Sequence, residues 1–356
     1  MSAMRDIARP APEAQNAVPA SEAQNAVPAP EAQSAMPAPE AQNAMPAPEA
    51  RYAWSVAVFG RNEAASIADC LRAIAQAGQG QAPHVTVLLN GTTDDSPARA
   101  AQALRDEGLP GRVYDIPHGD KSHAVNLFLH DVRPRAETYF CVDAYARMRP
   151  DALRHLAASL AARPAALAAA AMPSTGRSAA ALRRMMLDQS GLHGSLFALR
   201  GGFVDRLVAA GLRLPVGLYR GDGMLGAFVL HDLDAAQGGW DTGRIAMTPE
   251  ASWTTSGWQP WRWRDLRRHL RRLVQQGRGR LESAAMRSVI YAGGFPALPA
   301  RAETMVLAWI AADAAARTPR LWRDPFAWLA LARLRQSGVP APDSLRPRLL
   351  WRSEGA

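Results

Sequence analysis

Five polar residues in this sequence are of types that can bind a charged substrate or move a proton, and each follows a short apolar run. They are Asn62, Glu63, Asn90, Asp94 and Asp143. Carboxylates can hold a cation or accept a proton, and amides can hydrogen-bond a polar ligand from either side. Polar residues also follow most strands simply because loops face water, so their position alone leaves a purely structural role open.

A parallel sheet is the element that would bring these side chains together. Apolar runs rich in β-branched residues occupy 54–59, 85–89, 113–116 and 138–142, and helical patterns begin at Ser66, at Ser96-Pro97 and near Lys121. Strands that alternate with helices of about 10–15 residues are typical of βαβ units. Ligands of such sheets bind beyond the carboxyl ends of the strands, where the five polar residues fall. We therefore predict an α/β fold with a Rossmann-type, mostly parallel sheet flanked by helices.

The composition excludes several classes of protein. Hydrophobic residues make up 48% and charged residues 21%, as in a globular protein. The 41 Lys+Arg against 32 Asp+Glu give a net charge of +9, which favours phosphates, acidic lipids or nucleic acid. The two cysteines, Cys70 and Cys141, form no disulfide framework or zinc pattern, which predicts a reducing, cytoplasmic setting. The first residues lack an export signal, and the sequence holds no apolar run of about 18 residues that could cross a membrane.

Residues 1–51 are expected to form a disordered tail. A nine-residue unit repeats between residues 12 and 50, as the recurrence of glutamate at every ninth position shows. These residues are Glu13, Glu22, Glu31, Glu40 and Glu49. Proline, alanine and small polar residues bury too little apolar surface to offset the entropy lost on ordering.

Three motifs follow one another along the chain: Ser55-Val-Ala-Val-Phe-Gly-Arg-Asn-Glu63, Asn90-Gly-Thr-Thr-Asp94 and Gly119-Asp-Lys-Ser-His-Ala-Val-Asn126. Together they resemble the family 2 glycosyltransferases, which have the GT-A fold, and the resemblance runs from about Trp54 to Arg272. It implies a hexosyl- or related transferase that uses a nucleotide-sugar donor, with the catalytic domain at 52–257.

The resemblance also implies roles for residues in these motifs. Asn62, Glu63, Asn90 and Asp94 would shape the pocket for the nucleotide base, and Lys121 would lie near the phosphates. Leu89 stands where many family members carry a base-reading aspartate, which puts uracil recognition in doubt.

Asp143-Ala-Tyr145 falls where the family has its Asp-x-Asp motif. There a divalent cation, magnesium or manganese, neutralises the leaving nucleoside diphosphate. Tyr145 replaces the second aspartate, and a phenol is a poor ligand for a hard cation. Asp143 would then hold the metal with the diphosphate alone, or cationic side chains would replace the metal, or catalysis has been lost. A mere loop-capping role for Asp143 also stays open.

Two further motifs lie downstream. Tyr219-Arg-Gly-Asp-Gly223 stands where inverting family members carry the catalytic base, so that the resemblance assigns Asp222 to this role. The last four of these residues, Arg220-Gly-Asp-Gly223, are also good turn formers, which is the structural alternative. Gln259-Pro-Trp-Arg-Trp263 is similar to a Gln-x-x-Arg-Trp motif, which implies that Arg262 and Trp263 contact the donor and the acceptor.

Residues 258–356 are expected to begin with a basic amphipathic helix, Trp263 to Gln276, and to continue as a helical extension. The arginine-rich face of the helix would be solvated, or would contact the inner face of a membrane that carries a lipid-linked acceptor. Nucleic acid is the least favoured partner because no recognition motif accompanies the charge.

Two rival functions remain beside an inverting glycosyltransferase acting on a saccharide or lipid-linked hydroxyl. A nucleotidyltransferase should carry a glycine-rich loop with a basic residue directly after the first strand, and Gly60-Arg-Asn-Glu63 differs from that pattern. A non-catalytic sugar-nucleotide or nucleic-acid binding protein is favoured by Tyr145 and by the positive charge. Donor turnover, with and without divalent metal, separates an enzyme from a binding protein.

Overall fold

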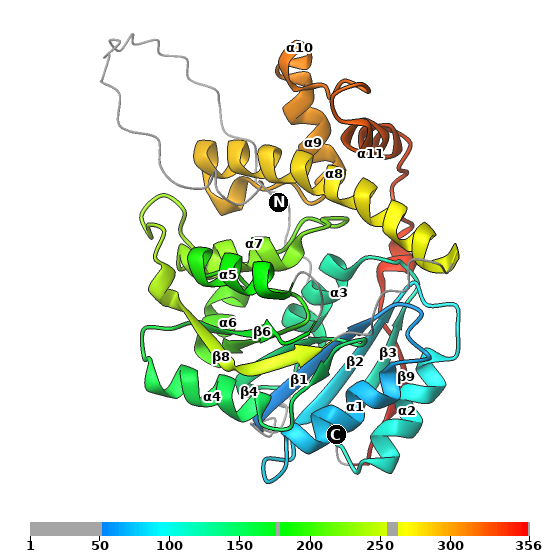
Figure 1. The fold of residues 1–356 in the computed structure, drawn as a ribbon, viewed down its shortest axis with the longest axis vertical. Helices are drawn as coiled ribbons and strands as arrows, with labels where there is room; N and C mark the ends of the chain where they lie inside the picture. The colour runs from blue at the N-terminus through cyan, green and yellow to red at the C-terminus, as the bar shows by residue number, and fades with distance from the viewer. Residues whose placement is uncertain (1–51, 176–178, 255–262, 355–356) are drawn as a thin grey trace, which may run out of the picture. The chain divides into compact units, whose positions relative to one another are not determined.

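A sheet of nine strands runs through the part of the chain that the computed structural model describes, residues 52–175, 179–254 and 263–354, the side chains of 263–269 excepted (Figure 1). These residues all belong to one unit, Ala50–Ala356. The tail predicted at 1–51 lies outside the described residues, and its disorder stays a prediction. No helix within the described ranges is long and apolar enough to cross a membrane.

The strand order is β5-β8-β6-β7-β4-β1-β2-β3-β9. The strands are β1 Tyr52–Gly60, β2 His84–Asn90, β3 Gly111–Ile116, β4 Ala136–Asp143, β5 Arg147–Met148, β6 Ala168–Pro173, β7 Leu196–Arg200, β8 Ile245–Thr254 and β9 Arg348–Arg352. β4, β1, β2 and β3 are parallel neighbours, as the sequence predicts, so their carboxyl ends meet at one edge. Antiparallel pairings join β7 to β4 and β9 to β3 on either side of this parallel core.

Both faces of the sheet are covered by helices, which explains why the sequence of β1 is almost continuously apolar. Ala57 and Phe59 pack into the apolar cluster on one face, whereas Trp54, Val56 and Val58 pack into the cluster on the other. Side chains alternate along a strand, so a strand buried on both faces needs apolar residues at successive positions.

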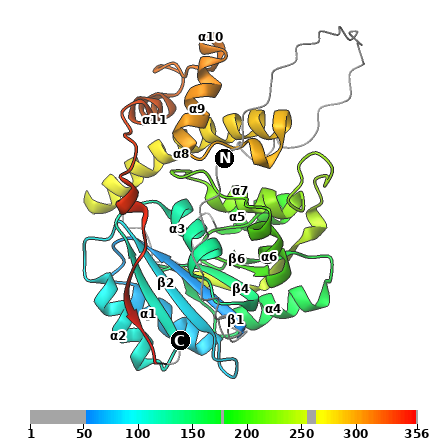
Figure 2. The ribbon, with the colours of Figure 1, turned by 180° about the vertical axis from the view of Figure 1, so that it is seen from behind.

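Helices on the two faces supply the rest of these clusters (Figures 1 and 2). α1, α2 and α4 pack on one face; α3 and α6 to α9 pack on the other. The helices are α1 Ile67–Ala77, α2 Ser96–Asp106, α3 Lys121–Leu127 with a π-helical turn Phe128–Val132, α4 Ala152–Ala162, α5 Ala179–Gln189, α6 Gly201–Ala209, α7 Gly221–Leu230, α8 Trp263–Gly293, α9 Ala302–Ala311, α10 Ala314–Arg317 and α11 Pro325–Arg335.

The basic helix predicted at Trp263 to Gln276 is the first half of α8, which continues to Gly293. Along its described part Val274 is buried, whereas Leu270 and Arg271 are exposed. Gly277 lets α8 approach α11 closely, because a methyl group there would lie 2.5 Å from the Phe326 carbonyl carbon.

The C-terminal residues do more than form a helical extension. After α11 the chain returns along the sheet, and β9 pairs antiparallel with β3. The sequence indicated no strand here, because Leu349, Leu350 and Trp351 stand between arginines without a clear alternation. The last strand therefore ties the extension back to the parallel core of the sheet, at β3.

Candidate functional site

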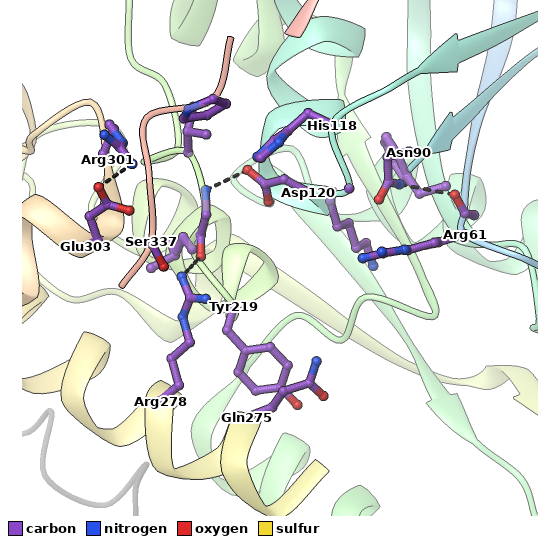
Figure 3. Close-up of a pocket in the computed structure, with 18 of the residues that line it drawn as sticks. Arg61, Asn90, His118, Asp120, Tyr219, Gln275, Arg278, Arg301, Glu303 and Ser337 are labelled. Atoms are coloured by element: carbon purple, nitrogen blue, oxygen red, sulfur yellow. Dashed lines mark hydrogen bonds and ion pairs between the residues drawn. The ribbon is translucent and has the colours of Figure 1, made fainter. Parts of the chain in front are cut away.

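A cavity of about 570 Å³ opens at the carboxyl ends of β1, β2 and β4 (Figure 3). Its size is in the usual range for small-molecule sites. Glu63, Asn90, Lys121 and Asp143 line it, as the sequence predicts. The cavity is therefore where a ligand of an open α/β sheet is expected to bind.

The loops after β1 and β2 are locked to each other by hydrogen bonds. Asn62, in a left-handed conformation with φ 56°, accepts a hydrogen bond from the Thr93 amide through its Oδ1 at 2.7 Å. Asp94 accepts one from the Ala64 amide at 3.1 Å. Neither Asn62 nor Asp94 belongs to the described residues that line the cavity. Both hold the loops in place from the side.

Glu63 and Asn90 are held at the cavity by these same loops. The Glu63 amide donates to Ser96 Oγ at 2.8 Å, and the Ser66 hydroxyl donates to Glu63 Oε2 at 2.6 Å. Ser66 occupies the N-cap position of α1 but makes no side-chain capping hydrogen bond. Asn90, almost fully buried, donates from Nδ2 to the Gly60 carbonyl at 3.2 Å.

Asp120 positions Lys121 at the start of α3. Its carboxylate accepts hydrogen bonds from the Ser122 and His123 amides at 3.0 and 3.3 Å, which caps the helix. The same carboxylate accepts one from the Gly217 amide at 2.6 Å. The helix start is thereby attached to the segment around Gly217, which also lines the cavity.

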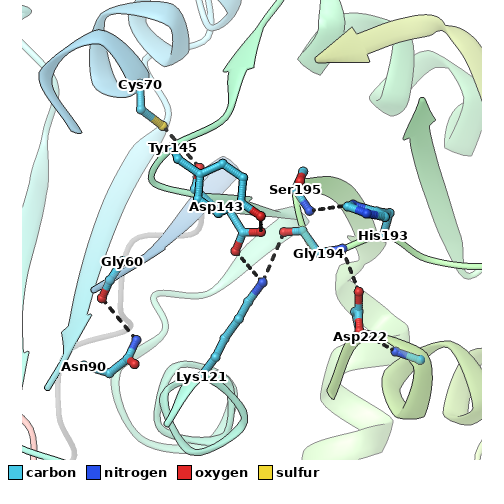
Figure 4. Close-up of polar contacts among 11 residues, drawn as sticks. Gly60, Cys70, Asn90, Lys121, Asp143, Tyr145, His193, Gly194, Ser195 and Asp222 are labelled. Carbon is cyan, nitrogen blue, oxygen red and sulfur yellow. Dashed lines mark hydrogen bonds and ion pairs between the residues drawn. The ribbon is translucent and has the colours of Figure 1, made fainter. Parts of the chain in front are cut away.

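Lys121, Asp143 and Tyr145 form one polar cluster at the end of β4 (Figure 4). The Lys121 ammonium forms an ion pair with Asp143 Oδ1. The Tyr145 hydroxyl donates to the other carboxylate oxygen, Oδ2, at 2.7 Å. Both oxygens of the buried Asp143 carboxylate are therefore engaged by side chains of this chain.

Gly194 connects this cluster to Asp222. Its carbonyl accepts a hydrogen bond from Lys121 Nζ at 3.3 Å, and its amide donates to Asp222 Oδ2 at 2.9 Å. A methyl group at Gly194 would lie 2.6 Å from Lys121 Nζ, 3.4 Å from Asp222 Oδ2 and 3.6 Å from Asp143 Oδ2. Only a residue without a side chain lets all three groups converge here.

Asp222 lies in the first turn of α7, beside the described wall of the cavity and outside it. Its Oδ1 accepts a hydrogen bond from the Gly223 amide at 3.0 Å, so that each oxygen has one backbone donor. A carboxylate oxygen can accept more than one hydrogen bond. Asp222 is thus oriented, and it keeps acceptor capacity for a ligand.

Burial and charge set the protonation states around these groups. Partial burial opposes the charged form of Lys121, but the carboxylates of Asp143 and Asp222 outweigh it and raise the pKa of the ammonium. Partial burial and the adjacent Asp143 charge raise the pKa of Tyr145. Burial lowers the pKa of His193, whose ring stacks on Trp253 with centroids 4.9 Å apart. At neutral pH, Lys121 is therefore charged, whereas Tyr145 and His193 are neutral.

The C-terminal extension forms one wall of the cavity. Glu282 of α8, almost fully buried, accepts hydrogen bonds from Arg278 at 2.6 Å and from the Tyr219 amide at 2.9 Å. Arg278 also donates to the Gly217 carbonyl. Arg301, which forms an ion pair with Glu303, completes this side (Figure 3). Both arginines on this wall, Arg278 and Arg301, are therefore paired with a glutamate.

A divalent metal fits this donor set poorly. No cluster of three or more His, Cys, Asp or Glu side chains suited to a metal occurs among the described residues. The one predicted ligand, Asp143, is shared between an ammonium and a phenol hydroxyl. Hard divalent cations prefer several oxygen ligands, usually with more than one carboxylate.

The two remaining predicted site residues are Arg262 and Trp263. Arg262 lies outside the described residues, and of Trp263 only the backbone is described, as the first residue of α8. Sequence reasoning missed Gly194 as the meeting point of the charged groups. The signal for it was faint: a glycine two residues before the apolar run of β7.

No model of a known protein family matches the sequence, and no curated protein matches it. Among solved structures, a mannosyltransferase from Pyrobaculum calidifontis in complex with GDP-Man and Mn²⁺ is similar, with 18% sequence identity and a TM-score of 0.52. The match covers 85% of this chain and 80% of the mannosyltransferase. The chain has a GT-A-type fold.

Two other structures are more distant. TarS (residues 1–349) of S. aureus, in complex with UDP-GlcNAc, is 13% identical over 80% of each chain, with a TM-score of 0.49. Glucosyl-3-phosphoglycerate synthase from Mycobacterium tuberculosis is 17% identical over 66% of this chain and 78% of its own, with a TM-score of 0.46. The assignment of the GT-A-type fold rests on the mannosyltransferase, and it confirms the fold predicted from the motifs.

Proposed function

We propose that this chain is an inverting glycosyltransferase of the family 2 type, which transfers a hexosyl or related group from a nucleoside diphosphate sugar to an acceptor hydroxyl. One observation carries the proposal. At the ligand-binding edge of a GT-A-type sheet, a cation at the cavity, Lys121, and a separate carboxylate, Asp222, both contact Gly194. Glycosyl transfer needs such a pair, a positive group for the departing diphosphate and a base for the attacking hydroxyl.

The nucleotide half of the donor would lie between the loops after β1 and β2. Glu63 and Asn90 would face the base and ribose, and Asn62 and Asp94 would hold the two loops in place. Burial alone would raise the pKa of Asp94, but hydrogen bonds from Ser96 and from the Ala64 amide lower it. Its carboxylate therefore stays charged and keeps the loop closed at neutral pH. The unplaced Arg262 and Trp263 remain proposed contacts of the donor side.

The reaction would start when Asp222 accepts the proton of the acceptor hydroxyl. The oxygen attacks the anomeric carbon while the bond from that carbon to the donor phosphate breaks, and its electron pair stays on the nucleoside diphosphate. Attack from the side opposite the leaving group inverts the anomeric configuration. The two backbone hydrogen bonds to Asp222 fix the direction of its free lone pairs, which is what a positioned base requires.

A donor screen followed by kinetics of an Asp222 variant tests the proposal. Thermal shift with UDP-, GDP-, TDP- and ADP-linked sugars should find one donor that raises the Tm, because a ligand bound only by the native state stabilises it. With that donor, Asp222→Asn should lower kcat by about 10²- to 10⁴-fold with little change in donor affinity. NMR of the first product formed should show the opposite anomeric configuration to the donor.

Asp188→Asn is the matched control, since Asp188 is an exposed aspartate of α5 that does not line the cavity. It should leave kcat unchanged. Donor binding together with full turnover in Asp222→Asn would contradict the assignment of the base. Donor binding without any turnover in the wild type would favour a sugar-nucleotide binding protein instead.

We also propose that the C-terminal extension, residues 258–356, contacts an anionic membrane surface peripherally. Between α10 and α11, Leu321 and Trp322 are 54% and 74% exposed, and Arg320 and Arg323 flank them. The Arg323 guanidinium carbon lies 5.4 Å from the centroid of the Trp322 ring. Exposed tryptophan beside arginine suits the headgroup region of an anionic bilayer. A lipid-linked acceptor would be reached from such a surface.

Vesicle sedimentation tests this contact. The protein should sediment with vesicles that contain phosphatidylserine and much less with pure phosphatidylcholine. Leu321→Ala/Trp322→Ala should weaken the binding, whereas Leu187→Ala, an exposed leucine of α5, should not. Equal binding of the double variant and the wild type would refute the surface, and so would a preference for duplex DNA over vesicles.

A further inference from the structure

The site lacks the carboxylate that would share a divalent cation with Asp143. Tyr145 stands two residues after Asp143, and its hydroxyl donates to Asp143 Oδ2 instead of offering a second anionic ligand. Tyr145 therefore occupies one oxygen of Asp143 and provides no carboxylate ligand of its own.

Lys121 occupies the other oxygen of the same carboxylate. Its ammonium pairs with Asp143 Oδ1 and donates to the Gly194 carbonyl at 3.3 Å. An ammonium has three donors, so one N–H remains for a ligand. The side chain is 42% exposed and belongs to the wall of the cavity. The free donor thus faces space that a ligand can occupy.

Lys121 is also the only lysine in the chain, since every other basic residue among the 41 is an arginine. Arginine presents a wide planar fork, whereas lysine is a compact point charge on a flexible stem. A compact charge is the better substitute for a metal ion between one carboxylate and a diphosphate.

We propose that the Lys121 ammonium, held by Asp143 and by the Gly194 carbonyl, takes the place of a divalent cation against the donor diphosphate. This rests on the proposed glycosyl transfer. When the bond between the anomeric carbon and the donor phosphate breaks, the electron pair remains on the phosphate oxygen and the free Lys121 N–H hydrogen-bonds it. No proton leaves the ammonium, and no metal is required to balance the step.

Nucleotide binding by calorimetry, with GDP and UDP as probes, tests the proposal without relying on turnover. The wild type should bind its preferred nucleotide in the presence of EDTA, and manganese should change the Kd little. Lys121→Met, which keeps the length of the side chain and removes its charge, should weaken binding in EDTA by about 10- to 100-fold. An unchanged Tm of the variant would show that it is folded.

Tyr145→Asp is the complementary variant, since it restores the missing carboxylate. Manganese should tighten its nucleotide binding by about tenfold. Electron paramagnetic resonance should then show protein-bound Mn²⁺ in the ternary mixture with Tyr145→Asp, and with the wild type only the signal of the nucleotide and Mn²⁺ without protein. Tyr145→Phe, which adds no ligand, should behave like the wild type in both measurements.

Because Lys121 is the sole lysine, its rate of acetylation, measured by mass spectrometry, shows whether a ligand covers its ammonium. The diphosphate should protect Lys121 in EDTA, the matching nucleoside should not, and the α-amino group serves as the internal control. Nucleotide binding that needs manganese, or equal protection by the nucleoside, would overturn the role of Lys121 while leaving the proposed glycosyl transfer in place. Failure of every nucleotide to bind in either buffer would overturn both.

Discussion

Replacing Gly194 with alanine probes the point at which the charged groups of the site converge. The new methyl carbon would stand 2.6 Å from Lys121 Nζ, well inside the 3.4 Å at which ordinary contacts begin. The φ angle of Gly194 is not positive, so alanine causes no backbone strain. Asp222 and Asp143 stay at 3.4 and 3.6 Å and need not move. The substitution therefore acts on Lys121 alone.

The size of the effect follows from these distances. The ammonium must withdraw by about 0.8 Å, which lengthens its 3.3 Å hydrogen bond to the Gly194 carbonyl beyond bonding distance. A displacement of about 1 Å in a group that positions the reaction can cost up to about 10²-fold in rate. We expect kcat/KM to fall roughly 10- to 100-fold. Lys121 is a flexible, half-exposed side chain, so stability should change by less than about 1 kcal/mol.

Steady-state kinetics with the preferred donor and thermal denaturation measure the two quantities separately. Gly202→Ala is the matched control, because Gly202 lies in α6 and a methyl group there has nothing within 4 Å. It should leave turnover unchanged and raise the stability of the helix by about 0.5–1 kcal/mol. If Gly194→Ala kept full activity, Lys121 would have no positional role in the reaction.

Two further predictions concern stability. His84 is fully buried, and burial, followed by the charge of Arg112, lowers its pKa from 6.5 to about 4, so the unfolded chain binds a proton more readily than the folded one between these pH values. The free energy of unfolding should therefore fall by about 3 kcal/mol as the pH drops from 6.5 to 4. Urea unfolding at several pH values should show a weaker pH dependence for His84→Leu than for the wild type. An equal pH dependence in the variant would mean that other groups cause the loss of stability. Gly277→Ala would place a methyl group 2.5 Å from the Phe326 carbonyl carbon and 2.6 Å from the Ala327 nitrogen. Because these are backbone atoms and cannot rotate away as a side chain can, α8 and α11 must separate, which should lower the free energy of unfolding by about 1–3 kcal/mol. Calorimetry should show a lower Tm, and an unchanged Tm would mean that the two helices are not in close contact.

The parallel core of the sheet could be read from the sequence because its signals are local. β1, β2, β3 and β4 each coincide with a predicted apolar run, and the helices between them begin close to the predicted residues. A strand buried on both faces needs successive apolar residues, and a helix start needs particular residues within one turn. Both patterns are complete within about ten neighbouring residues. The same locality placed Glu63, Asn90, Lys121 and Asp143 at the edge where the cavity lies.

The contacts that shape the site depend on residues far apart in the chain, and these only the tertiary structure decided. Asp143 meets Lys121 across 22 residues, and Gly194 meets Lys121 across 73. Glu282 reaches the Tyr219 amide across 63 residues and thereby makes α8 a wall of the cavity. Such contacts follow from the strand order and from how the C-terminal extension packs, and neither leaves a periodic trace in the sequence. From the sequence alone Tyr145 is simply a missing metal ligand. In the structure its hydroxyl and the Lys121 ammonium together occupy the carboxylate that the metal would need.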